Sequence, residues 1–158
     1  MAAFGHNSKI ISIEELKGGF FNVAYFITFE NNMKTVLKVA HSNDIKVLRC
    51  EKDIMKSEIK ALNFIANNTR IPTPTVFYYN FSKNFINRDY FFMEYIHGKP
   101  LDQLYDHFSE DEFLYISHQV GAYAKQFHNM KGNAFGYTLQ IIKAIKNGQM
   151  LLFHLLMT

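Results

Sequence analysis

Two charged residues interrupt apolar patterns in this sequence, and together they restrict how the chain can fold. Lys38 lies within the apolar segment 36–40, which has the composition of a buried strand. Glu58 lies four residues after Ile54 and four before Leu62, so helical spacing places its carboxylate on an apolar helix face. Burying either charge alone costs several kcal/mol. We therefore predict that this strand packs against this helix and that Lys38 and Glu58 form an ion pair.

Each of these residues alone has an ordinary explanation. A strand lysine usually lies on an exposed edge, and a helix glutamate usually lies at a solvated boundary.

A diglycine, Gly18-Gly19, precedes the lysine strand and permits positive φ and a close approach of the backbone to a phosphate. Asn22 is placed to hydrogen-bond across that loop. An ordinary hairpin turn explains the dipeptide equally well when it is taken alone.

Residues 91–100 form an apolar run that breaks into Met-Glu-Tyr-Ile before a glycine turn. We interpret them as a strand that continues into a hinge. The C=O of Glu94 and the N–H of Ile96 would present one acceptor and one donor to an adenine edge, and Met93 would fill the space behind it. The alternative is an edge strand that ends at Gly98.

The remaining pattern predicts an α+β fold. Strands are expected at residues 10–13, 24–29, 34–40, 75–79 and 90–95, with Asn31-Asn32 as a hairpin turn. An amphipathic helix is expected over 44–67, and Pro72 and Pro74 bar its continuation. Ser109 and Glu112 have the spacing of a capping box that opens a helix to about residue 130. The sum is a five-stranded antiparallel sheet with one major helix, followed by the first helices of a second lobe.

Composition excludes several classes of protein. The 158 residues suffice for one ordinary domain, and a net charge of +3 without basic clusters argues against a nucleic-acid partner. Cys50 cannot form an internal disulfide, and the amino terminus lacks the pattern of a signal peptide. The longest apolar run, 150–157, is far below the ~20 residues of a membrane helix. We expect a cytoplasmic protein, and the scattered histidines predict no metal site.

Several short motifs together resemble the aminoglycoside phosphotransferase family of small-molecule kinases, over residues 10–137. They are Gly18-Gly19-Phe20-Phe21-Asn22, Leu37-Lys38-Val39, Glu51 and Glu58, Ile71-Pro72-Thr73-Pro74, residues 92–98, Phe127-His128 and Phe135-Gly136-Tyr137. The resemblance implies a protein-kinase-like fold, with residues 1–97 as the amino-terminal lobe and 98–137 as the hinge linker and first helix of the second lobe. It also implies ATP with Mg²⁺ and phosphoryl transfer to a hydroxyl of a small-molecule acceptor. Lys38 would bind phosphates, Glu58 would hold it, and residues 94–96 would face adenine.

The family's His-Gly-Asp…Asn loop and its later metal-binding Asp do not occur in the 158 residues. We therefore assign no catalytic residue and no metal ligand, and we expect a truncated form with negligible kinase activity alone. Residues 138–158 are atypical. A shifted reading frame from Asn147 could encode a Trp-x-x-Ala-Phe segment like that of the family, so one hypothesis is that 149–158 is out-of-frame translation. The other is a short natural amphipathic helix.

A second function comes from a different class. The chain would be a non-catalytic nucleotide-binding or self-associating interaction module, whose exposed lobe interface and apolar tail drive association. The tail residues concerned are Leu151, Leu152, Phe153, Leu155 and Leu156. A third possibility is that another chain supplies the missing half of the kinase fold.

Overall fold

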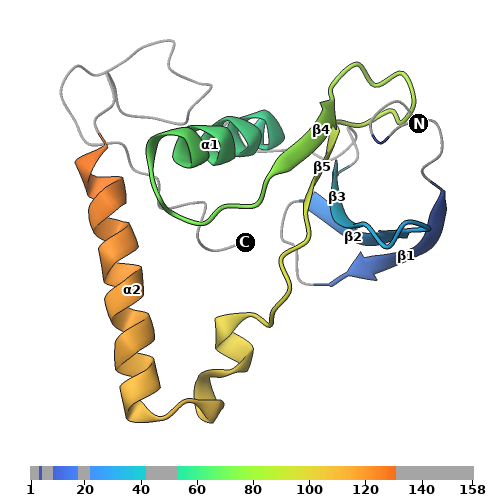
Figure 1. The fold of residues 1–158 in the computed structure, drawn as a ribbon. Helices are drawn as coiled ribbons and strands as arrows, with labels where there is room; N and C mark the ends of the chain where they lie inside the picture. Colours follow the sequence, from blue (N-terminus) through green and yellow to red (C-terminus); the bar gives the residue numbers. More distant parts are fainter. Residues whose placement is uncertain (1–3, 5–8, 18–21, 42–52, 131–158) are drawn as a thin grey trace.

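The computed structural model describes residue 4 and residues 9–17, 22–41 and 53–130, which form a mixed α+β fold (Figure 1). In chain order the elements are β1 (Ile10–Leu16), β2 (Asn22–Phe29), β3 (Lys34–Ala40), α1 (Ile54–Asn68), β4 (Val76–Asn80), β5 (Tyr90–Glu94), the 3-10 turns η2 (Leu101–Gln103) and η3 (Tyr105–His107), and α2 (Glu110–Asn129).

The five strands form one antiparallel sheet in the order β1-β2-β3-β5-β4, which confirms the predicted antiparallel sheet. Helix α1 lies in the connection between β3 and β4, and β5 then returns to pair with both of those strands. Strands β3 and β5 are therefore interior. Because β5 is interior, the alternative that residues 90–95 form an edge strand is wrong. Because β3 is interior, the alternative that Lys38 lies on an exposed edge strand is also wrong.

The turn between β2 and β3 is built by two asparagines, as predicted. Asn32 has φ 62°, and the N–H of Phe29 donates to the C=O of Met33 at 2.9 Å. The side-chain oxygen of Asn31 accepts from the N–H of Met33 at 3.0 Å. Asparagine tolerates the left-handed conformation that such a turn requires, so the local sequence is sufficient to specify the hairpin.

Helix α1 begins at Ile54. The prediction that the helix includes residue 53 is therefore wrong. Residues 44–52, where the helix was also predicted, lie outside the described residues. Asp53 has φ 58°, a left-handed backbone that cannot continue a right-handed helix. The buried side chains recur at helical spacing: Met55, Ile59, Ala61, Leu62 and Ile65. The N–H of Thr69 closes the helix on the C=O of Ile65 at 2.9 Å.

Apolar clusters cover both faces of the sheet. On the face toward α1, Phe91 packs with Met55, Ile59 and Leu62 of the helix. On the opposite face a second cluster holds Ile27, Phe29, Val39, Tyr90 and Phe92. The ring of Phe4 covers this cluster, with its centroid 5.1 Å from Phe29 and 5.0 Å from Phe92.

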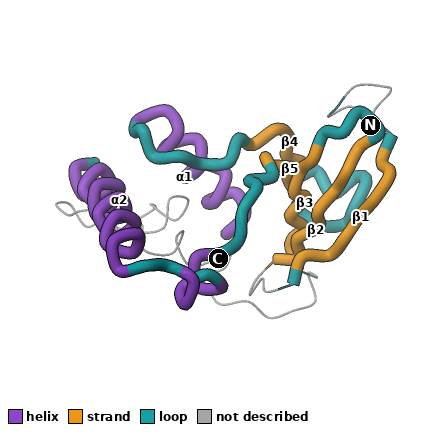
Figure 2. Tube along the Cα trace, turned by 60° about the horizontal axis from the view of Figure 1, so that its bottom comes forward, coloured by secondary structure: helices purple, strands orange, loops and turns teal. Residues whose placement is uncertain are grey.

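Helix α2 starts with the predicted capping box. The N–H of Ser109 donates to Glu112 Oε2 at 2.9 Å, and the N–H of Glu112 donates to Ser109 Oγ at 3.4 Å. Figures 1 and 2 show α1 between the sheet and α2. None of the α2 residues is buried. No helix within the described ranges has the length and apolar character needed to cross a membrane.

Candidate functional site

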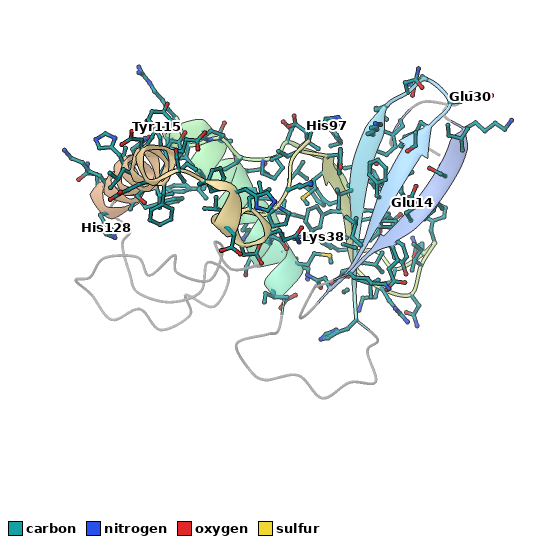
Figure 3. All side chains as sticks on the ribbon, turned by 90° about the horizontal axis from the view of Figure 1, so that it is seen from below. Glu14, Glu30, Lys38, His97, Tyr115 and His128 are labelled. Carbon is teal, nitrogen blue, oxygen red and sulfur yellow. The ribbon has the colours of Figure 1, made fainter. Side chains whose placement is uncertain are left out.

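The ion pair predicted between Lys38 and Glu58 is present. Nζ of Lys38, in β3, lies 2.6 Å from Oε1 of Glu58, in α1. The two side chains are only 17% and 16% exposed, so both charges have lost most of their water. Figure 3 shows Lys38 where the sheet meets α1. A pair this short and this sheltered is a charge-assisted hydrogen bond rather than a surface ion pair.

Strand register explains why the lysine reaches the helix. Lys38 pairs with Ala24 of β2 on one side and with Phe91 of β5 on the other. Paired residues share a sheet face, and Phe91 is fully buried against α1. This row of the sheet therefore meets the helix, and Lys38 meets Glu58. Sequence reasoning did not identify Ala24 and Phe91 as the cross-strand neighbours of Lys38, because strand register cannot be determined from one strand alone.

Three of the residues predicted to bind a nucleotide share this face. Asn22 pairs with Ala40, and Met93 pairs with Val36. Since Ala40 and Val36 alternate with Lys38 along β3, Asn22 and Met93 point to the same side of the sheet as the lysine. Both are half-buried, and Met93 packs against the cluster around Phe91.

Strand β5 ends at Glu94, one residue before the predicted end at residue 95. The N–H of Glu94 donates to the C=O of Thr75 at 2.8 Å, and its carboxylate accepts from the N–H of Thr75 at 3.1 Å. Ile96 follows with 59% of its surface exposed. Among the described residues its N–H has no hydrogen-bond acceptor, so this donor is accessible to a ligand.

A cluster of aromatic side chains that sequence reasoning missed lies at the end of β5. The ring of Tyr95 lies 4.5 Å from that of Phe26 and 4.8 Å from that of His97. Nζ of Lys34 lies 6.0 Å from the centroid of Phe26. Aromatic pairs at these separations are attractive. This aromatic cluster therefore joins the residues on either side of Ile96 to β2.

Gly18 and Gly19 lie outside the described residues, so their predicted phosphate-binding role remains a prediction. No group of three or more His, Cys, Asp or Glu side chains in the described ranges could hold a metal ion. Mg²⁺ is usually held by one or two carboxylates together with substrate phosphates. The carboxylate at this site, Glu58, already accepts the lysine, so the described site suits phosphate better than magnesium.

No protein-family model matches the chain, and no curated protein matches it either. An ammonium group has three donors. Glu58 takes one of those of Lys38, and the others can donate to phosphate oxygens on the same side of the sheet. The arrangement can fix an anion, but the described residues include no group placed as a general base.

Proposed function

We propose that this chain is the nucleotide-binding lobe, with the first helix of the second lobe, of a small-molecule kinase like the aminoglycoside phosphotransferases. The observation that supports it is the 2.6 Å pair between a lysine on the third strand and a glutamate on the helix that follows. Protein kinases hold ATP phosphates with a lysine on their third strand, and a glutamate of the next helix holds that lysine.

In this proposal the ligand is ATP, and each residue has a defined role. Lys38 donates to the phosphates and Glu58 keeps its ammonium in place. Gly18, Gly19 and Asn22 form the loop over the phosphates. Met93 lies behind the base, while the C=O of Glu94 and the N–H of Ile96 bind the adenine edge. The aromatic cluster of Phe26, Tyr95 and His97 holds the hinge in register with the sheet.

Phosphoryl transfer needs more than these residues. The 158 residues contain no His-Gly-Asp sequence, and ATP with Mg²⁺ would supply the transferable phosphoryl group only where a base and metal ligands are also present. We therefore propose that these residues by themselves bind nucleotide without turnover. Transfer to the hydroxyl of a small-molecule acceptor would require groups from outside them. A cytoplasmic location, where ATP is abundant and a lone cysteine stays reduced, belongs to the same proposal.

The test is isothermal titration with ATP, with and without Mg²⁺, of the wild type and two lysine variants. Lys38→Ala removes the phosphate donor, and Lys34→Ala is the matched control because Lys34 lies on the same face of the same strand but is exposed. A hydrogen bond to a charged group is worth about 1.5–3 kcal/mol, so Lys38→Ala should weaken ATP binding by about 10- to 150-fold. Equal affinity of the two variants, or no binding by the wild type, would contradict the proposal.

A second candidate, a self-associating module, is favoured by a different observation: α2 carries apolar side chains but buries none of them. It requires no nucleotide. The two candidates are separable, because ATP binding without association supports the first and association without ATP binding supports the second.

A further inference from the structure

One hydrogen bond at the end of β5 goes to a side chain where an antiparallel ladder would use the backbone. Val76 pairs with Met93, so Thr75 and Glu94 stand opposite each other at the next position. The two residues of a hydrogen-bonded antiparallel pair exchange both N–H···O=C bonds. The N–H of Glu94 donates to the C=O of Thr75 at 2.8 Å, but the N–H of Thr75 donates to Oε2 of Glu94, at 3.1 Å. The carboxylate of Glu94 therefore takes the place of its own C=O.

The C=O of Glu94 is turned away from β3 as well. The N–H of Ala40, in β3, donates to the C=O of Asp89 at 2.9 Å, and the backbone groups of a strand alternate between its two neighbours. Residues 91 and 93 therefore direct their backbone groups to β3, and Glu94 directs its own to the side of β4. Beyond Glu94 the chain leaves the sheet (Figure 1). The side chain of Glu94 thus leaves this C=O open to a ligand.

We propose that Glu94 is a positioning residue that makes the site selective for a purine with a 6-amino group. This inference rests on the proposed function, in which the C=O of Glu94 and the N–H of Ile96 bind the edge of the base. Adenine carries a donor at position 6, whereas guanine carries an acceptor oxygen there. The open C=O can accept from the amino group of adenine. Against guanine it would face a second acceptor, and neither oxygen would be satisfied.

The Glu94 carboxylate suits this role because of its charge and its exposure. An ionised carboxylate is a stronger acceptor for an N–H than a neutral peptide C=O. Glu94 is exposed, so its charge is kept without a large desolvation cost. In an extended chain the N–H two residues later lies on the same side as the C=O, and Ile96 is 59% exposed. The side chain therefore maintains an acceptor beside a donor without touching the nucleotide itself.

The test is isothermal titration of the wild type, Glu94→Ala and Glu94→Gln with ATP and with purine riboside 5′-triphosphate, which lacks the 6-amino group. The wild type should bind ATP about 5- to 10-fold more tightly, the effect of one ordinary hydrogen bond. In Glu94→Ala the N–H of Thr75 should return to the C=O of residue 94, so the preference should fall below about 2-fold. Glu94→Gln keeps an acceptor oxygen without the charge and should retain the preference. Circular dichroism checks that both variants fold.

A preference that persists in Glu94→Ala would overturn the inference, as would its loss in Glu94→Gln. Both results are measured on chains that bind nucleotide, so they leave the proposed function standing. If the wild type binds neither triphosphate, the proposed function fails and the selectivity fails with it.

Nuclear magnetic resonance tests the hydrogen bond without any nucleotide. In the wild type a scalar coupling through the hydrogen bond should join the amide nitrogen of Thr75 to the side-chain carboxyl carbon of Glu94. In Glu94→Ala the coupling should move to the backbone carbonyl carbon of residue 94. A coupling to that backbone carbon in the wild type would overturn the inference, whatever the chain binds.

Discussion

The free energy that couples Lys38 to Glu58 can be measured with a double-mutant cycle. Lys38→Met and Glu58→Gln keep most of the side-chain volume and remove one charge each. Their combination removes both charges, so that neither is left buried without a partner. If the pair contributes as the structure indicates, the double variant should lose less stability than the sum of the two single variants.

The size of the coupling follows from the geometry. At 2.6 Å, an effective dielectric constant of about 20 gives a gross attraction of about 6 kcal/mol. Removing most of the water from both groups offsets much of this attraction, whereas fully exposed pairs are worth about 0–1 kcal/mol. With side chains 17% and 16% exposed, we expect a net coupling of about 1–3 kcal/mol.

The assay is urea denaturation followed by far-ultraviolet circular dichroism. Each single substitution should lower the free energy of unfolding by about 1–3 kcal/mol, because the remaining partner becomes a sheltered, unpaired group. The reasoning would be refuted if the two effects added within about 0.5 kcal/mol, the behaviour of independent sites. That result would mean that the two charges do not stabilise each other in solution.

A third variant separates structural from functional roles. Lys38→Met with Glu58→Leu replaces the pair by apolar groups, a change that is often neutral for stability. We expect its free energy of unfolding to stay within about 1 kcal/mol of the wild type while its ATP affinity is lost. Retained ATP affinity in this folded variant would show that the pair has a structural role only.

Three further predictions concern stability. Thr35→Val should raise the free energy of unfolding by about 1 kcal/mol, because the buried Thr35 hydroxyl has no hydrogen-bond partner among the described residues; a lower melting temperature would contradict this. Phe91→Ala should lower it by about 3–5 kcal/mol in urea denaturation, since the fully buried ring joins the sheet to α1; a loss below about 1 kcal/mol would contradict that packing. The backbone N–H and the hydroxyl of Ser109 lower the pKa of Glu112 below its ordinary value. The hydrogen bonds from Ser109 to the ionised Glu112 carboxylate thus stabilise the folded state above the unfolded-state pKa, near 4.5. This stabilisation is lost as pH falls through the lower folded-state pKa. Helical ellipticity should fall in acid, and less steeply in Ser109→Ala, whose cap loss costs about 1 kcal/mol at neutral pH; identical acid profiles would contradict the capping role.

Local patterns were sufficient for much of the fold. Alternating apolar residues located the strands, the asparagine pair located the first hairpin, and the spacing from Ser109 to Glu112 located the start of α2. The cost of burying two charged residues within apolar segments was sufficient to predict the Lys38–Glu58 pair. These features depend on residues within a few positions of one another, or on a burial cost that only one arrangement relieves.

Long-range pairing decided the rest. The interior position of β5, the alignment of Ala24 and Phe91 with Lys38, and the ring contact that joins Tyr95 to Phe26 all depend on strands distant in the sequence. The left-handed backbone of Asp53, immediately before α1, is likewise not evident from its neighbours. Hydrophobic periodicity shows which side of a strand is buried but not which strand lies beside it. The sequence could therefore name the charged pair, whereas the tertiary structure alone placed its surroundings.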